Sequence, residues 1–363
     1  MKNGSIIIAE HLREYKEEDL HKCEVHVNLW KDAKRKWFKL GVEYLLDIGI
    51  KIYEYKNTIE SLTLFFPFDV EKSAFTDLGK PLSESKSLVN TVFNENLKHI
   101  EGEGEQESLS KYESKVEDGE KQKQRSFWLY ILAPNNYDVS KKDGLTGTFL
   151  TIKLNGAELS DGEKNGNLYI RFRAKLNNDQ IKDYIKREED LANDVLQAAF
   201  SKTELYDVRI NDRRETDDKV LEEIETSMKN TLMPIRKAHF FFITNVVDKV
   251  SNGNSERMDT RMLEMEKWKP YAGYEDGHPR IAYHWKKSDE PGGEFEYFEI
   301  FFRNICDNRS YHKIILYLFV AFWIGSVGSL IGSLNCEVFP WIGATAVLMM
   351  TIVLGGYYCL RKL

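Results

Sequence analysis

The sequence predicts an α+β fold, with a strand-rich cytoplasmic domain over residues 1–305 and a C-terminal transmembrane hairpin of two helices over residues 306–363. Two observations support this prediction. Short stretches rich in β-branched and aromatic residues recur through the first three hundred residues, and two long apolar runs occupy the end of the chain. We therefore expect the first part to fold around its own core and the second part to lie in lipid.

Eight stretches of the first part have the length and composition of β-strands, and turn residues bound each of them. They are residues 23–30, 59–68, 126–133, 146–154, 167–175, 238–244, 280–286 and 294–302. Residues 178–200, 217–230 and 256–268 have the apolar spacing that is typical of helices. The order of these elements predicts an α+β domain dominated by antiparallel sheet.

Residues 101–125 have the composition of an unfolded loop. Glutamate and glycine alternate at its start, charged residues of both signs follow, and Leu109, Tyr112 and Val116 are almost its only apolar side chains. Such a segment buries too little surface to order itself. It either separates two subdomains or forms a surface insertion in one, and we expect a disordered insertion.

The two apolar runs, residues 314–334 and 338–360, each have the length of a membrane-spanning helix. A span needs about 20 apolar residues, and neither run contains a charged side chain. The flanking charges are Arg303, Arg309 and Lys313 before the first run, Glu337 between the runs, and Arg361 and Lys362 after the second. Positive charge at both outer ends predicts a multi-pass protein whose N- and C-termini face the cytoplasm.

Small residues gather on one side of the first predicted span. At about 100° per residue, one half of that helix holds Gly325, Ser326, Gly328, Ser329, Gly332 and Ser333. The second span has a weaker stripe of Ala344, Thr351 and Gly355. Such stripes let helices approach closely, so we expect a homo-oligomer in which these residues pack helices or line an ion channel. The alternative is that the two spans of one chain pack against each other.

Composition narrows the cellular setting and the partners. The net charge of −7 argues against binding to duplex nucleic acid, although it leaves room for a local basic pocket. Four cysteines, Cys23, Cys306, Cys336 and Cys359, have no paired spacing. This pattern is typical of a reduced, cytoplasmic protein.

The sequence has no phosphate-binding loop, no His-Glu-x-x-His and no Gly-x-Ser-x-Gly. We therefore expect no catalytic residue, no enzymatic activity and no cofactor. A metal site at His21, Cys23 and His26 is not expected, because alternation along a strand places His26 on the face opposite Cys23. The loop at residues 275–280 combines acid, base and cation, as active-site loops do and as ordinary turns also do.

Two basic stretches are candidates for binding anions. In residues 168–175, Tyr169, Arg171, Arg173 and Lys175 alternate with apolar residues and share one face of a strand. We expect this face to bind a nucleotide or oligonucleotide, the alternative being a solvated sheet surface. The other stretch is the cationic run of residues 31–39, flanked by Trp30 and Trp37, which as a helix would present solvated lysines.

The layout of the chain resembles that of membrane effectors of bacterial antiviral systems of the Hailong, CBASS and Panoptes types. The resemblance rests on the two-span tail, the strand-rich first part, and the junction at residues 303–313, which has no flexible linker. It implies antiviral defence at the bacterial inner membrane, where a nucleotide-type signal controls an oligomeric pore.

These expectations favour a membrane-anchored effector whose cytoplasmic sensor domain gates a transmembrane assembly. Two alternatives come from other classes of protein. One is a membrane-tethered enzyme that acts on a nucleotide or phosphate substrate through residues 275–280. The other is a passive membrane scaffold that recruits partners through residues 101–125.

Overall fold

The computed structural model describes residues 4–17, 20–36, 39–55, 57–93, 95–100, 108–118, 121–155, 157–159, 166–189, 201–252, 258–273, 279–288, 293–307, 318–319 and 321–326. The chain divides into two compact units. The first comprises Met1–Glu189 and Thr203–Cys306, and the second comprises Asp190–Lys202 and Asp307–Leu363. All sheet pairings and side-chain contacts below lie within the first unit unless the second is named.

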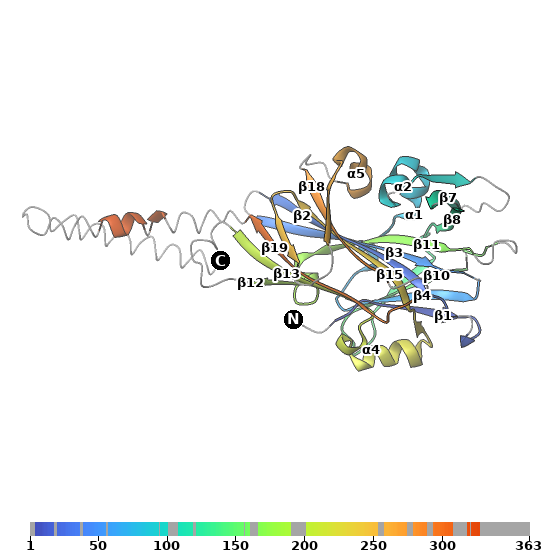
Figure 1. The fold of residues 1–363 in the computed structure, drawn as a ribbon. Coiled ribbons are helices and arrows are strands. Elements are labelled where there is room, and N and C mark those ends of the chain that lie inside the picture. Colours follow the sequence, from blue (N-terminus) through green and yellow to red (C-terminus); the bar gives the residue numbers. More distant parts are fainter. Residues whose placement is uncertain are drawn as a thin grey trace, which may run out of the picture. The chain divides into compact units, whose positions relative to one another are not determined.

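Three sheets build the first unit (Figure 1). The largest has the order β17 (Met258–Leu263), β18 (Arg280–Ser288), β15 (Ile235–Asn245), β2 (Cys23–Lys36), β3 (Lys39–Ile52), β11 (Leu168–Asn177), β8 (Lys121–Tyr130), β7 (Leu109–Asp118), β6 (Leu97–Ile100), with β5 (Phe75–Asp77) also paired to β11. A five-stranded sheet has the order β14 (Thr231–Leu232), β1 (Ile7–Leu12), β4 (Ile59–Phe66), β10 (Thr148–Lys153), β9 (Tyr137–Ser140). A four-stranded sheet has the order β12 (Lys186–Glu189), β13 (Ser201–Ile210), β19 (Phe298–Asp307), β16 (Lys249–Asn252).

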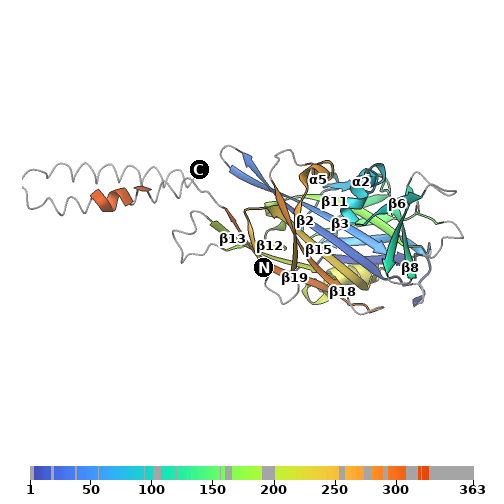
Figure 2. The ribbon, with the colours of Figure 1, turned by 45° about the horizontal axis from the view of Figure 1, so that its top comes forward.

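Short helices complete the unit. They are α1 (Gly79–Glu84), α2 (Lys86–Phe93), α3 (Asn178–Ile181), α4 (Asp218–Glu222), which continues as a π-helical turn over Glu223–Ser227, and α5 (Met265–Ala272), with 3-10 turns at Lys72–Ala74 and Arg213–Glu215. Figures 1 and 2 both show α2 and α5 close together beside the large sheet, and these two helices contact each other.

Strand alternation divides the buried side chains into layers. On β2, Cys23, Val25, Val27 and Leu29 enter the main core, which also takes side chains from the five-stranded and four-stranded sheets. Trp30 points the other way, into a second core under α1, α2 and α5. A period of two therefore gives the large sheet two covered faces, an apolar one inside and one under the helices.

The strand predictions agree with the structure, since each of the eight predicted stretches contains a strand. The helix predictions fare less well. Residues 217–230 contain α4 and its π-helical turn, but only Asn178–Ile181 is helical among the described part of residues 178–200. In residues 256–268, β17 precedes α5, so the methionine spacing there spans a strand and a helix.

The predicted disordered insertion at residues 101–125 differs from the structure in its second half. There β7 and β8 pair as an antiparallel hairpin, with Leu109 opposite Tyr130 and Tyr112 opposite Phe127. Leu109, Tyr112 and Phe127 are buried, so the few apolar residues of the segment are enough when a neighbouring strand shares them. Residues 101–107 lie outside the described residues.

The structure corrects the predicted fold class, because it does not support the transmembrane hairpin. No helix among the described residues is long and apolar enough to cross a membrane. Of residues 314–334 the structure describes residues 318–319 and 321–326, which are helical. This finding overturns the predicted inner-membrane location and the predicted ion channel. The lipid bilayer as a partner stays a prediction.

The residues expected to pack the two spans fall in the second unit. Gly325 and Ser326 belong to the described helix, where the Ser326 hydroxyl donates to the carbonyl of Phe322 at 2.8 Å and a Cβ on Gly325 would meet no atom within 4 Å. The others, Gly328, Ser329, Gly332, Ser333, Ala344, Thr351 and Gly355, lie outside the described residues, as does the whole of residues 338–360.

Candidate functional site

A cluster of ionisable side chains lies on the helix-covered face of the large sheet. Glu24 and His26 are two residues apart on β2, and alternation places them on the face opposite Cys23. The neighbouring strand β15 runs parallel to β2 with His239 directly opposite His26. Strand pairing therefore brings together two residues that are local in sequence and one that is more than two hundred positions away.

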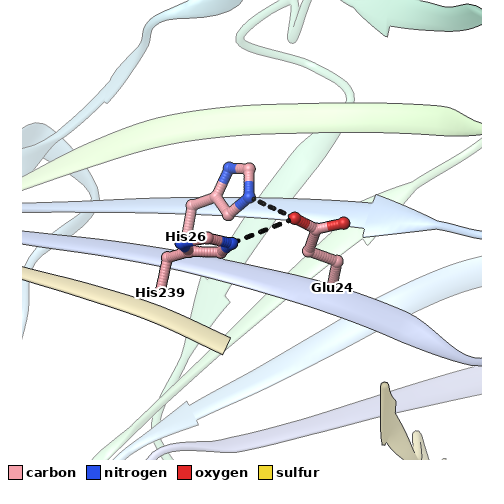
Figure 3. A group of neighbouring side chains, drawn as sticks. All are labelled: Glu24, His26 and His239. Carbon is pink, nitrogen blue, oxygen red and sulfur yellow. Dashed lines mark hydrogen bonds and ion pairs between the residues drawn. The ribbon is translucent and has the colours of Figure 1, made fainter. Parts of the chain in front are cut away.

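One carboxylate oxygen of Glu24 faces a nitrogen of each of the two imidazole rings (Figure 3). Glu24 Oε1 is 2.9 Å from His26 Nε2 and 3.4 Å from His239 Nε2. The ammonium of Lys237, also on β15, is 3.2 Å from the same oxygen. The hydroxyl of Tyr53 donates a hydrogen bond to Glu24 Oε2. Every contact of this carboxylate is therefore with a ring nitrogen, an ammonium or a hydroxyl.

The far nitrogen of each ring is also hydrogen-bonded. His26 Nδ1 lies 3.2 Å from the hydroxyl of Tyr169, which accepts a hydrogen bond from Arg171 Nη1 at 2.8 Å. His239 Nδ1 lies 2.9 Å from Nε2 of His284, on β18. The ring planes are thus fixed from both sides, and both Nε2 atoms are directed at Glu24.

A glycine makes room for the Tyr169 hydroxyl. Gly49 on β3 lies opposite His26 on one side and Arg171 on the other. A Cβ at Gly49 would be 2.1 Å from the Tyr169 hydroxyl oxygen, which is too close for any side chain. The contact between Tyr169 and His26 therefore depends on the absence of a side chain at this position.

Burial and hydrogen bonding set the charges of the cluster. Burial opposes ionisation of Glu24, but the hydrogen bonds of His239 and His26 and the charge of Lys237 outweigh it and hold the pKa of this carboxyl far below its usual range. Burial lowers the pKa of His239 to about 4, although the hydrogen bond with Glu24 opposes this shift. Burial also lowers the pKa of His26. At neutral pH the site therefore holds an ionised carboxylate and two neutral imidazoles.

We expect the metal-free protein to lose stability as the pH falls from about 6.5 to about 4. Burial and the charge of His239 lower the pKa of His284 to about 4, so His239 and His284 both stay neutral in the folded protein while an unfolded chain takes up protons. Above pH 6.5 neither histidine lowers the free energy of unfolding. Below pH 6.5 each of them lowers it by at most about 1.4 kcal/mol per pH unit.

Urea unfolding in the presence of a chelator, at half-unit steps of pH, measures this slope. Because glutamine takes up no proton, His284→Gln should unfold with a shallower dependence on pH than the wild type between pH 6.5 and 4. Equal slopes for the two proteins would contradict the assignment of a neutral buried His284.

The donor set matches a transition-metal site. Glu24, His26 and His239 each offer one ligand atom, and these atoms all lie within 4.8 Å of one another. Their side chains are 8%, 17% and 15% exposed, so the cluster is mostly covered without being sealed. Two imidazoles and one carboxylate are ligands that Zn²⁺ accepts in sites that keep a fourth position open.

The predicted anion-binding residues lie nearby but are engaged inside the protein. Tyr169 and Arg171 are buried, and Arg171 Nε donates to the hydroxyl of Tyr271 on α5 at 2.7 Å. Arg173 forms a two-point ion pair with Asp47, at 2.6 and 2.9 Å. The alternation predicted for this strand is confirmed, but Arg171 and Arg173 on its polar face are bonded to Tyr271 of α5 and do not form an open surface.

Lys175 differs from the other three predicted residues. It is 58% exposed and lies 3.6 Å from Glu43 across the strand pair. Nucleotide binding by Tyr169, Arg171, Arg173 and Lys175 together stays a prediction, and of the four only Lys175 is largely exposed to solvent.

The remaining sequence candidates separate in the fold. In the cationic run of residues 31–39, residues 31–36 belong to β2 and Lys39 begins β3, so the described part is not helical. Lys31 is buried in an ion pair with Glu204 at 2.6 Å. Trp37 and residues 274–278 lie outside the described residues, while Arg280 is buried and donates to the carbonyl of Lys31.

The expectation that His21, Cys23 and His26 do not form a site agrees with the structure. Cys23 lies in the main core, and His21 pairs with the buried carboxylate of Glu10 at 2.9 Å. Sequence reasoning missed Glu24, which shares the face of His26, and missed His239 altogether. The signal for Glu24 was its position two residues from His26 on a predicted strand.

Comparison with known proteins adds no family to this picture. No protein-family model matches the sequence, and no curated protein matches it. The chemistry of the cluster therefore has to be argued from its own geometry.

Proposed function

We propose that the protein binds a divalent transition-metal ion, with Zn²⁺ the best match, through Glu24, His26 and His239, and that the ion keeps an open position for a further ligand. The observation that supports the proposal is the placement of one carboxylate oxygen and two ring nitrogens on adjacent strands. Glu24 Oε1 lies 2.9 Å from His26 Nε2 and 3.4 Å from His239 Nε2, and all three ligand atoms lie within 4.8 Å of one another.

These distances are close to what a metal ion requires. Ligands about 2.0–2.1 Å from a tetrahedral ion are separated by roughly 3.3 Å. The two distances from Glu24 Oε1 differ from this value by a few tenths of an ångström or less, and the two ring nitrogens lie within 4.8 Å of each other. Sites on sheet strands hold such geometry better than sites on loops.

The hydrogen bonds behind the rings also support a metal site. Imidazoles that bind metals usually donate their other ring N–H to a fixed acceptor, which selects the tautomer. The Tyr169 hydroxyl is in that position behind His26, and Nε2 of His284 is in that position behind His239. With a metal on the two Nε2 atoms, both Nδ1 atoms carry the proton and donate to these partners.

The charges of the cluster also favour a metal ion. Both rings are neutral at pH 7 and Glu24 is ionised, which are the protonation states that bind metals. In the metal-free protein Lys237 neutralises Glu24. A dication that takes Glu24 Oε1 replaces this ammonium as the main partner of the carboxylate.

Competition of the purified protein with a fluorescent zinc chelator tests the proposal. We expect the wild type to bind one Zn²⁺ at this site, and we expect His239→Gln to lower the affinity by more than about 100-fold, because even partners behind a ligand are worth about 10–100-fold. His99→Gln, which changes an exposed histidine on β6, is the matched control and should bind like the wild type. A wild type without zinc affinity, or equal affinities for wild type and His239→Gln, would refute it.

A ligand-controlled effector of antiviral defence stays a prediction, as does the absence of enzymatic activity. The metal site is compatible with either a sensor or a catalyst, since an ion with an open position can bind a signal or polarise a substrate. A His239→Gln variant that no longer binds zinc can then be compared with the wild type for signal binding and for catalysis.

A further inference from the structure

The ammonium of Lys237 contacts the same oxygen, Glu24 Oε1, that would bind the metal ion. Its Nζ atom is 3.2 Å from Glu24 Oε1, and its side chain is 28% exposed. If a metal ion takes this oxygen, the ammonium is left a few ångströms from a dication. At such a distance two cations repel each other strongly, because a partly covered site screens charges less than water does.

The surroundings contain more positive than negative charge. Arg171 is buried next to Tyr169, and its guanidinium donates to the hydroxyls of Tyr169 and Tyr271. Asp47, a buried carboxylate on this face, is paired with Arg173. Loading the site with a dication therefore leaves a local excess of positive charge.

We propose that the metal ion binds together with an oxyanion of the phosphate type, which fills the open coordination position and pairs with Lys237. This inference rests on the proposed metal site and names the class of ligand that completes it. An anion shared by the metal and the ammonium turns their repulsion into two attractions. A phosphate group suits the position because it offers several oxygens, so one can bind the metal while another accepts from the ammonium.

Lys237 thus has two partners in turn. In the metal-free protein it pairs with Glu24, and in the loaded protein it pairs with the anion. Because β15 holds its backbone opposite Glu24, the side chain changes partner without leaving the site. The binding of metal and of anion is then coupled, and each raises the affinity for the other by the same factor.

Titration of the full chain with Co²⁺, followed by the visible absorption of the bound ion, tests the coupling. It is done in a buffer without oxyanions and again with millimolar inorganic phosphate. We expect phosphate to raise the Co²⁺ affinity of the wild type by about 10-fold or more, within the usual range of coupling between sites. We also expect phosphate to change the absorption spectrum, because it enters the coordination sphere.

Lys237→Gln separates the parts of the inference. Without phosphate it should bind Co²⁺ more tightly than the wild type, because the repelling ammonium is gone, and phosphate should then have little effect. Lys175→Gln, which removes an exposed lysine further along the same face, is the control and should keep the full phosphate effect. Acetate in place of phosphate shows whether any carboxylate serves as well, which would overturn the assignment to a phosphate-type anion.

The outcomes distinguish the two proposals. No Co²⁺ binding by the wild type refutes the metal site itself. Co²⁺ binding that is indifferent to phosphate overturns the inference and leaves the metal site standing. A phosphate effect that survives Lys237→Gln but is lost in Lys175→Gln places the anion at the end of β11, and this also overturns the inference.

Discussion

Replacing Glu204 by glutamine is expected to lower the free energy of unfolding by about 3–5 kcal/mol, because the change removes one partner from a buried network of charges. Glu204 Oε2 lies 2.6 Å from the ammonium of Lys31, and Glu204 Oε1 lies 2.8 Å from that of Lys186. Asp248 is 3.4 Å from Lys31 on another side. All four side chains are at most 7% exposed.

The network joins two sheets through balanced charge. Lys31 comes from β2 in the large sheet, while Lys186 and Glu204 come from β12 and β13 in the four-stranded sheet. Two ammonium groups face two carboxylates, so the charges of these four side chains balance. Burial opposes ionisation of Glu204, but the charges of Lys31 and Lys186 outweigh it and hold the pKa of its carboxyl well below the usual range.

Glutamine at position 204 keeps the shape and leaves two buried ammonium groups with one carboxylate. The added change Lys186→Met removes the surplus charge, so the double variant should be more stable than Glu204→Gln alone. Urea unfolding of both variants, with Lys186→Met as the third corner, gives the coupling energy. Glu222→Gln, on the exposed side of α4, is the control and should change stability by no more than about 0.5 kcal/mol.

An additive double variant would show that Glu204 and Lys186 act independently, against the charge-balance argument. If Glu204→Gln lowered the free energy of unfolding by less than about 1 kcal/mol, the buried network would contribute no more than an exposed ion pair does. Neither result is compatible with four charges that depend on one another.

Each of the eight stretches predicted as strands contains strand residues in the structure. Further strands carry the same signal in the sequence. In β3, residues 40, 42, 44, 46, 48, 50 and 52 are all apolar, which is a strict period of two. That strand is nevertheless not among the eight predicted stretches. The signal was present, and the structure shows β2 and β3 as one long hairpin.

Other elements depend on partners that a sequence does not reveal. Strand β7 has few apolar residues of its own, and its Leu109 and Tyr112 are buried where it pairs with β8. Composition alone therefore predicted disorder. Length and hydropathy likewise predicted two spans near the C-terminus, whereas the described part of the chain contains no helix suited to crossing a membrane.

The candidate site divides in the same way. That Glu24 and His26 share a face follows from their spacing on a strand, and so does the exclusion of Cys23. The third ligand does not follow, because His239 reaches the site through the parallel pairing of β15 with β2. Nor could the helix cover over Arg171 be foreseen, since the contact of Tyr271 with it joins residues a hundred positions apart.

Replacing Gly49 by alanine is expected to cost about 2–4 kcal/mol of stability and to weaken metal binding about 10–100-fold. The new Cβ would lie 2.1 Å from the hydroxyl oxygen of Tyr169 and 2.8 Å from its ring carbon Cζ, so the ring has to move. Overpacking of this kind costs about 1–3 kcal/mol, and a lost buried hydrogen bond adds about 1 kcal/mol. The loss of affinity follows because His26 depends on this hydroxyl for its orientation.

The ring of Tyr169 has no free space to enter. It is fully buried, its centroid is 4.9 Å from that of Phe93 on α2, and its hydroxyl also accepts from Arg171. Tyr169→Phe removes the atom that an alanine at position 49 would hit first. The double variant should therefore lose less stability than the sum of the losses of the two single variants, as measured by urea unfolding. Additive losses, or zinc affinity unchanged in Gly49→Ala, would show that neither the glycine nor the tyrosine hydroxyl positions His26.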